Sequence, residues 1–253
     1  MKRNELSRNQ SAKLIYFLRH CPGVYVGEES QCLRFLQAVL WISRTGAQWR
    51  EVPERFGKWN SIYKRYARWC EQGIWEKLHS YCVTDPDLEQ IIIDSTVIRA
   101  HPCAAGASTK RGGQAQQALG RSRGGFSTKI HLTVEALGNS LRFILTAGQG
   151  NDSPQAEALI NQLCFDRLIA DKAYDTDRLR LLLAELGVEA VIPPKANRKT
   201  VYDYDAHLYK ERHLVECFIN KLKYYRRIFT RFDKLASRYL GFIHFAAALI
   251  WLR

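Results

Sequence analysis

The first 84 residues carry their apolar and polar positions at the spacings of helices. Residues 33–42 are apolar on most sides, and a second helix is expected to begin at the N-cap residues Asn60 and Ser61 and to end at Gly73. Within that second helix, aromatic and apolar side chains recur every three or four residues and basic side chains lie opposite. The apolar positions are Ile62, Tyr63, Tyr66 and Trp69, and the basic ones are Lys64, Arg65 and Arg68.

Short helices joined by a glycine turn admit two interpretations here. One is a helix-turn-helix module that binds DNA through its basic face. The other is an ordinary helical core whose basic face is solvated. The pattern favours neither, and residues 1–84 are taken as a small all-α, helix-turn-helix-like domain that is expected to bind DNA.

The period changes to that of strands after residues 85–87. Residues 90–97 are β-branched and apolar, as in a strand buried on both faces. Residues 127–135 and 141–145 flank a Gly-Asn turn and predict a hairpin. The elements expected next are a helix at 154–163, a strand at 167–170, a helix at 176–186, a strand at 188–192, a helix at 206–225 and a closing apolar helix.

Three consecutive strands followed by alternating helices and strands predict a mixed α/β fold. This is the order of a ribonuclease-H-like domain, which we expect over residues 88–253. Within it, residues 104–125 are rich in Gly, Ala, Gln and Ser and contain no acid. We interpret them as a flexible basic loop that DNA orders, with Arg121 and Arg123 on phosphates; an ordinary flexible loop is the alternative.

The charge balance indicates a polyanionic partner. Lys and Arg number 38 against 25 Asp and Glu, which gives a formal charge of +13. Such an excess favours phosphate contacts, so nucleic acid is the leading partner and an anionic membrane surface the second. Ribosomal and histone-like proteins rarely carry six tryptophans, as this chain does.

Seven irregularly spaced cysteines without a C-x-x-C pair argue against a disulfide framework and against a zinc site. The longest apolar stretch, residues 241–252, is far shorter than the roughly 20 residues that span a bilayer. The sequence therefore predicts a reduced, soluble, cytoplasmic protein with no membrane contact.

Two aspartates stand where an ionised carboxylate is costly. Asp94 lies inside the apolar strand 90–97, where it must be paired, protonated or bound to metal. Asp171 ends the fourth strand, and in a sheet of this order it would lie beside Asp94. Neighbouring carboxylates repel each other, and a divalent cation relieves the repulsion. The alternative is that each acid is a simple strand-end or cap residue.

A polar stripe on the helix expected at 206–225 supplies a third carboxylate. Its four side chains are separated by 3, 4 and 7 residues, which places them on one narrow face. They are Tyr209, Arg212, Glu216 and Lys223. Glu216 thus borders the apolar face that would pack on the sheet. In an isolated helix, a solvated stripe of ion pairs is the preferred explanation.

With Asp94 and Asp171, Glu216 would complete an oxygen-only site suited to two magnesium ions, with manganese as the expected substitute. Such ions, about 4 Å apart, activate water or a 3′-hydroxyl on one side of a phosphorus and stabilise the leaving oxygen on the other. The chemistry implied is phosphodiester cleavage and transfer.

Three motifs then resemble the signatures of a known family. They are DSTVIRAH at 94–101, ADKAYD at 170–175 and a Y-x2-R-x3-E-x6-K run that begins at Tyr209. Together they are similar to the DDE transposases of bacterial insertion sequences, with insertion-sequence family five of the Y-R-E-K group as the branch they resemble most. Further similar motifs are RTGA at 44–47, FGKWN at 56–60, GRSRGG at 120–125 and IPPK at 192–195.

The resemblance implies roles for single residues. Asp94, Asp171 and Glu216 match the metal-binding catalytic triad. The residues that match transposon-end contacts are Tyr209, Arg212 and Lys223, and the basic residues expected on the terminal inverted repeats are Lys64, Arg65 and Arg68. Because members act as pairs of subunits, a homodimer on double-stranded DNA is expected. Only 44 residues separate the second acid from the third, so the large β insertion of some relatives has no room.

The resemblance therefore implies a DNA transposase that binds terminal inverted repeats, nicks them by metal-assisted hydrolysis and joins the 3′-hydroxyls to target DNA. No covalent protein intermediate is expected. Two rivals stay open. A ribonuclease-H-like nuclease would cut without joining, and a catalytically idle DNA-binding repressor would keep the helices and the charge but make no use of the carboxylates.

Overall fold

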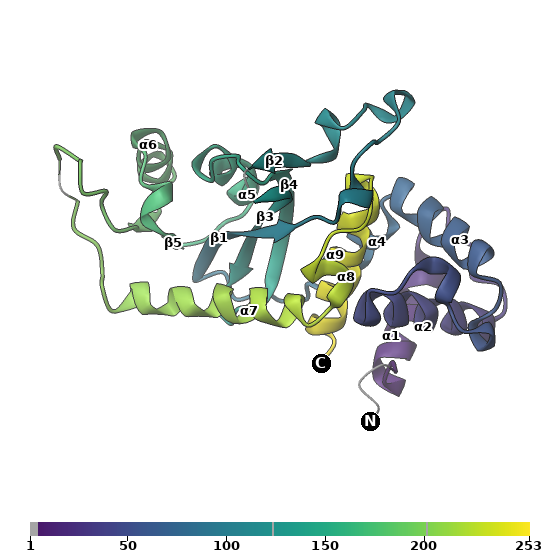
Figure 1. Ribbon diagram of the computed structural model, residues 1–253. Coiled ribbons are helices and arrows are strands. Elements are labelled where there is room, and N and C mark those ends of the chain that lie inside the picture. Colours follow the sequence, from purple (N-terminus) through teal and green to yellow (C-terminus); the bar gives the residue numbers. More distant parts are fainter. Residues whose placement is uncertain (1–4, 123, 201) are drawn as a thin grey trace. The chain divides into compact units, whose positions relative to one another are not determined.

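The computed structural model describes residues 5–122, 124–200 and 202–253, and Figure 1 labels most of its helices and strands. The chain folds into two compact units, each made of segments that are distant in sequence. The helical unit comprises the described residues up to Thr84, with Arg99–Gln117 and Lys221–Arg253. The sheet unit comprises Asp85–Ile98 and the described residues of Ala118–Asn220.

The helical unit is built around an apolar helix. Its helices are α1 (Arg8–His20), α2 (Glu29–Thr45), α3 (Trp59–Glu71), α4 (Ile74–Cys82), α8 (Arg226–Phe229) and α9 (Ala236–Trp251). Most side chains of α9 are buried, and this helix packs on α3 and α4. A Cβ added at Gly241 would lie 2.7 Å from Cys70 Sγ. Glycine therefore permits the close approach of α9 to α3.

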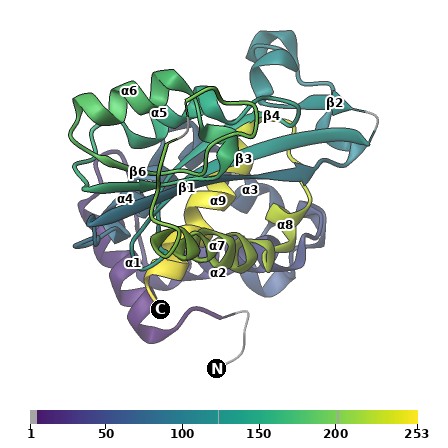
Figure 2. The same cartoon turned by 90° about the vertical axis from the view of Figure 1, so that its left-hand side faces the viewer.

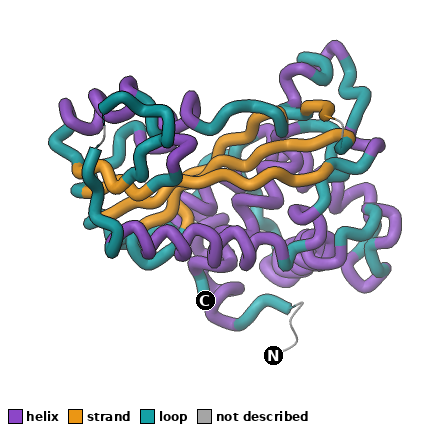
Figure 3. Tube along the Cα trace, turned by 60° about the vertical axis from the view of Figure 1, so that its left-hand side comes forward, coloured by secondary structure: helices purple, strands orange, loops and turns teal. Residues whose placement is uncertain are grey.

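The strands of the sheet unit form one mixed sheet, which Figure 3 shows in orange. They are β1 (Gln90–Arg99), β2 (Gly120–Ser122), β3 (Gly125–Glu135), β4 (Ser140–Ala147), β5 (Arg167–Ile169) and β6 (Glu189–Val191). Their order is β2-β3-β1-β5-β6, and β4 pairs with β3. β1, β5 and β6 run parallel, whereas β3 is antiparallel to β2 and β4.

Helices cover both faces of this sheet (Figure 2). They are α5 (Ala156–Ile160), α6 (Asp177–Glu185) and α7 (His213–Lys223). On the side of α5 and α6, Ile91 and Ile93 of β1 join an apolar core with Leu159 and Leu179. On the side of α7, Phe218 contacts the sheet. Because successive strand side chains face opposite sides, neighbouring residues of β1 serve different layers.

The mixed α/β fold class, the ribonuclease-H-like order and the all-α N-terminal region are confirmed. The compact units, however, do not follow a single cut near residue 85, because α9 buries its apolar surface against helices of the N-terminal region. The functional division into residues 1–84 and 88–253 stays a prediction.

All seven cysteines are free thiols.

Two expectations about single segments were wrong. Residues 104–125 are not one irregular loop, since Gly120–Ser122 form β2 and hydrogen-bond to β3, after short 3-10 turns. The long helix expected from residue 206 begins as the 3-10 turn Leu208–Arg212 and becomes α-helical only in α7. The Asp205 side chain accepts hydrogen bonds from the backbone N–H groups of His207, which precedes that turn, and of Leu208, its first residue, and these bonds fix the start of the turn.

Two helix ends also differ from expectation. α3 begins at Trp59, because the Lys58 carbonyl already accepts a hydrogen bond from the Ile62 N–H. The helix expected over 154–163 is a 3-10 turn followed by α5 and ends at Ile160, since Gln162 adopts a φ of 60°.

In the part of the chain that the structure describes, no helix is long and apolar enough to cross a membrane.

Candidate active site

Two parallel strands bring the first two acids to the same level of the sheet. β1 and β5 pair with Ile92 opposite Ile169, and Asp94 and Asp171 each follow two residues later. Asp94 Oδ1 accepts a hydrogen bond of 2.7 Å from the Ser95 N–H. Asp171 Oδ1 accepts one of 2.8 Å from the backbone N–H two residues ahead. In each carboxylate, one oxygen is therefore held by the backbone.

An arginine links the third acid to the first. Arg212 ends the 3-10 turn before α7, and Glu216 lies four residues on, in the first turn of α7. Arg212 Nη1 donates to Asp94 Oδ2 at 2.6 Å, and Nη2 donates to Glu216 Oε1. One guanidinium thus bridges a strand carboxylate and a helix carboxylate.

The electrostatics of Asp94 record the nearness of the other acids. Burial raises the pKa of Asp94 to about 6, and the negative charges of Asp171 and Glu216 add to the rise. The Ser95 N–H and the Arg212 guanidinium act in the opposite direction. The charges of Asp171 and Glu216 therefore both act on Asp94, and the Arg212 guanidinium opposes them.

Tyr209 lies near the same acids, whereas Lys223 belongs to the other unit. Burial raises the pKa of Tyr209, and the charges of Asp171 and Asp94 act in the same direction. Lys223 is the last residue of α7, beyond the point where the chain leaves the sheet unit. Of the four polar side chains expected in one stripe, the sheet unit thus gathers three around the aspartates.

The three carboxylates suit a divalent ion by their chemistry, because Mg²⁺ and Mn²⁺ prefer hard oxygen ligands. Among the described residues, however, no group of three or more His, Cys, Asp or Glu side chains is arranged so that it could hold a metal ion. The Arg212 guanidinium lies between Asp94 and Glu216, at the oxygens that a metal would need. The carboxylates are ligands of the type that a divalent ion prefers, but the cation that contacts Asp94 and Glu216 in this structure is the Arg212 guanidinium.

Comparison with protein families agrees with the geometry. Residues 85–251, which contain all three acids, match a family model described as "Transposase DDE domain". The chain belongs to the DDE transposases of insertion sequences. Residues 16–79 match a second model, "Putative transposase of IS4/5 family". The resemblance drawn from the motifs is confirmed, and a DDE domain uses divalent metal ions.

Two curated relatives are described as putative transposases for insertion sequence elements. The one for IS6501 from Brucella ovis is 46% identical over 129 residues, which cover 50% of this chain and 99% of the relative. The one for IS402 from Burkholderia cepacia is 32% identical over 135 residues, which cover 49% of this chain and 62% of the relative.

Solved structures of two transposases are also similar to this chain. A piggyBac transposase synaptic complex with hairpin DNA is 9% identical with a TM-score of 0.44, over 79% of this chain and 49% of that one. A pre-cleavage Mos1 transpososome is 13% identical with a TM-score of 0.27, over 92% of this chain and 80% of that one.

The sequence of this DDE domain did not reveal a polar network that joins Ser95 of β1 to Lys129 of β3 through Asp152. Asp152 Oδ1 accepts hydrogen bonds from Ser95 Oγ at 2.8 Å and from Lys129 Nζ at 2.9 Å. His131 Nδ1 lies 3.5 Å from the same oxygen, and burial lowers the pKa of His131 to about 4, so the ring is neutral. Ser95 follows Asp94 directly, so the network holds β1 from the opposite face of the sheet. The signal was available, because polar residues alternate along a strand expected to be buried.

The three basic residues expected on DNA differ in their surroundings on α3. Lys64 and Arg68 are exposed. Arg65 is half-buried, lies over the rings of Phe35 and Trp69 at 4.6 and 4.9 Å, and donates to a backbone carbonyl. Two of the three therefore present their charge to solvent, while the third packs within the helical unit.

The basic residues expected in the segment 104–125 can be placed only in part. Arg121 lies in β2, is exposed, and contacts the Phe126 ring at 5.6 Å. Arg123 lies outside the described residues. Arg121 thus extends from a strand edge of the DDE domain and not from an irregular loop.

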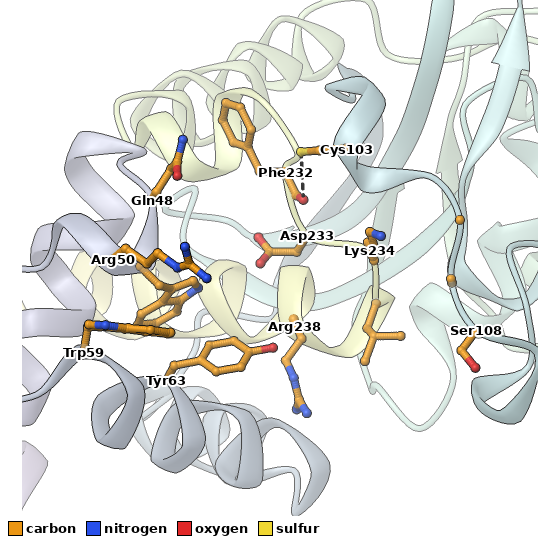
Figure 4. A pocket seen from close by; sticks show the side chains of 14 residues that line it. Gln48, Arg50, Trp59, Tyr63, Cys103, Ser108, Phe232, Asp233, Lys234 and Arg238 are labelled. Atoms are coloured by element: carbon orange, nitrogen blue, oxygen red, sulfur yellow. Dashed lines mark hydrogen bonds between the residues drawn. The ribbon is translucent and has the colours of Figure 1, made fainter.

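A hollow of about 700 Å³ opens in the helical unit (Figure 4). Trp59 is 36% exposed there, and the Arg50 guanidinium lies 5.7 Å from its ring. Trp49 meets Tyr63 edge to face at 5.4 Å, and the basic residues Lys234 and Arg238 and the acid Asp233 also line the hollow. Flat rings and cationic groups therefore line one concave surface.

Proposed function

We propose that this DDE transposase binds the terminal inverted repeats of its element, cleaves DNA there and joins the 3′ ends to target DNA. Asp94, Asp171 and Glu216 would hold two Mg²⁺ ions, with Mn²⁺ as a substitute. The observation that carries the proposal is that Asp94 and Asp171 follow the paired residues of β1 and β5 at matching positions, with Arg212 bonded to both Asp94 and Glu216. The raised pKa of Asp94 supports a shared site, because burial causes the rise and repulsion among the carboxylates adds to it.

The chain's own residues prepare the site for phosphodiester chemistry. The backbone N–H of Ser95 orients one oxygen of Asp94, and a backbone N–H of the turn after β5 does the same for Asp171. The second oxygens are left for a positively charged partner. When bound there, divalent ions supply activation of water or a 3′-hydroxyl and neutralisation of the phosphoryl charge. No protein side chain is expected to form a bond with the DNA.

Positive side chains are proposed to hold the DNA. The residues proposed for the transposon end are Tyr209, Arg212 and Lys223, and those proposed for neighbouring DNA are Lys64, Arg68, Arg121 and Arg123. The cationic hollow with Trp59 suits an unstacked base flanked by phosphates, since bases stack on indole rings. Two subunits would act together on two ends, as a homodimer. In this proposal residues 1–84 bind DNA and residues 88–253 catalyse.

A strand-transfer assay tests the proposal. The full chain is incubated with Mg²⁺, two duplexes that carry the end of its own element, and a supercoiled target plasmid. Joined product is expected, and it should disappear in Asp171→Asn while binding of the end duplex is retained. Cut ends without joined product would support a nuclease, and binding without any cleavage would support a repressor. Either of these results contradicts the proposal.

A further inference from the structure

The position of Arg212 sets a condition for metal binding. Its guanidinium is 24% exposed, and it bonds Asp94, whose side chain is 14% exposed, and Glu216, which is half exposed. Charge pairs that are partly withdrawn from water attract each other more strongly than pairs on an open surface. The arginine is therefore held inward and is not a loose surface group.

An arginine cannot vacate this position by losing its proton. Burial acts to lower the pKa of Arg212, but the negative charges of Asp94 and Glu216 outweigh it and raise the value. A guanidinium is a donor only, and it leaves two carboxylates most favourably when another anion accepts its hydrogen bonds. The phosphate groups of DNA are such anions, and arginine binds phosphate with two parallel hydrogen bonds.

A divalent ion and the inward arginine compete for the same atoms. The guanidinium engages Asp94 Oδ2 and Glu216 Oε1, which are two oxygens that a shared metal would take as ligands. Two cations on the same oxygens repel each other, so occupation by one excludes the other.

We propose that Arg212 is an internal counter-cation that closes the acidic site against divalent metal until a DNA phosphate draws the guanidinium away. The proposal rests on the function proposed above for Asp94, Asp171 and Glu216. It adds that DNA and metal bind with positive coupling, because each favours the state in which Arg212 has left the acids. A chain without bound DNA would then be protected from unproductive metal loading.

Binding of Mn²⁺ to the full chain without DNA tests the closed state, with free Mn²⁺ followed by electron paramagnetic resonance. Arg212→Gln should bind Mn²⁺ about tenfold more tightly than the wild type, which corresponds to about 1.4 kcal/mol. Arg167→Gln is the matched control, because Arg167 also bridges two carboxylates of the sheet unit, Glu89 and Glu189. It should leave Mn²⁺ affinity within twofold of the wild type.

Two further variants locate the effect and guard against misfolding. Adding Asp94→Asn to Arg212→Gln should remove the gain, since the gain depends on this carboxylate. Arg212→Lys keeps the charge but cannot bridge two acids with a planar fork, so it should give an increase of about threefold. If Arg212→Gln does not fold, as judged by its thermal unfolding curve, the Lys variant decides alone, and an affinity equal to the wild type overturns the proposal.

A duplex of the element's own end tests the coupling. It should tighten Mn²⁺ binding by the wild type about tenfold and that by Arg212→Gln less than twofold. Equal Mn²⁺ affinity of wild type and Arg212→Gln without DNA would overturn the counter-cation and leave the acidic site intact. Failure of every variant to bind Mn²⁺ through Asp94, with or without the duplex, would instead overturn the proposed function itself.

Discussion

Two aspartates of the sheet unit, the partly buried Asp94 and the buried Asp175, differ in how many hydrogen-bond donors they receive. Asp94 has one arginine and one backbone N–H, and two other acids lie close to it. Asp175 has two arginines, with Arg180 Nε at 2.6 Å and Arg198 Nε at 2.7 Å, and accepts a backbone N–H at 2.8 Å. Asp94 thus has fewer hydrogen-bond donors to offset its negative charge than Asp175 has.

The contrast appears in their protonation. Burial raises the pKa of Asp94 to about 6, with the neighbouring acids adding to the effect. Burial also acts to raise the pKa of Asp175, but the hydrogen bonds from Arg198, the Lys195 N–H and Arg180 outweigh it and lower the value to about 2. Burial alone thus does not decide whether the pKa of an aspartate rises or falls. The number of donors does, and it predicts opposite consequences for the two residues.

The largest effect is expected from Asp94→Asn. Loss of one metal ligand should reduce cleavage of end DNA at least about a thousandfold, or about 4 kcal/mol of barrier. The free energy of unfolding should change by less than about 1 kcal/mol, because the carboxylate is repelled by two neighbours and paired only once. Cleavage kinetics and urea unfolding measure the two quantities. An active variant, or an inactive one that is several kcal/mol less stable, would contradict the assignment of Asp94 as a functional acid.

Asp175→Asn should show the reverse behaviour in stability. Removing this carboxylate leaves the buried Arg180 guanidinium without its counter-ion and Arg198 with only the exposed Asp177, which should lower the free energy of unfolding by about 3 kcal/mol. The control is Asp177→Asn, since Asp177 pairs with Arg198 on the surface and is 78% exposed. It should cost less than about 1 kcal/mol. Similar costs for both variants would mean that burial of the Asp175 pair contributes nothing.

The pH dependence of stability should differ in sign between the two acids. An unfolded aspartate has a pKa of about 3.9. The lowered pKa of Asp175 stabilises the fold above about pH 4, and about 2 kcal/mol should be lost as the pH falls from 4 to 2. The raised pKa of Asp94 gives the opposite slope, because its contribution is present below about pH 4 and is lost as the pH rises to 6.

Urea unfolding without metal at pH 2.5, 4 and 6 measures both slopes. Asp175→Asn should remove the loss below pH 4, and Asp94→Asn should remove the decline between pH 4 and 6. If Asp94→Asn steepened that decline, the carboxylate would be stabilised by its charge in the fold, and the contrast with Asp175 would disappear.

The acids of the candidate site were accessible to sequence reasoning because their signals are local. One aspartate lies inside the apolar segment 90–97 and one directly follows residues 168–170, and both come just after the residues that pair β1 with β5. Helical spacing placed Glu216 on the border of a packed face. Such spacing survives even though the first turn before α7 is 3-10, since Arg212 and Glu216 are still one turn apart.

What the sequence could not provide are partners chosen by tertiary packing. The direction of Arg212 toward Asp94 and the network of Asp152 with Ser95 depend on which segments meet across the sheet. The same is true of Arg65, whose spacing on α3 equals that of an exposed basic residue. Its inward position depends on the aromatic rings that it packs against, and the spacing of residues along the chain does not predict this contact.

The smallest expected effect separates Arg65 from its neighbours on α3. Lys64 and Arg68 are exposed, so replacing both with Gln should make the plot of log affinity for DNA against log salt shallower by about 1.8, or about 0.9 for each phosphate that the protein no longer neutralises. Arg65→Gln should leave this slope unchanged and lower the free energy of unfolding by about 1 kcal/mol, because no guanidinium then packs on Phe35 and Trp69. Filter binding over a range of NaCl concentrations and urea unfolding provide both measurements. An unchanged slope in the double variant would mean that the basic face of α3 is exposed to solvent and does not contact DNA phosphates. A shallower slope in Arg65→Gln would show that an arginine packed on aromatic rings still contacts a phosphate. The number of partners within the fold, which distinguishes Asp175 from Asp94, would then not indicate which basic residues bind DNA.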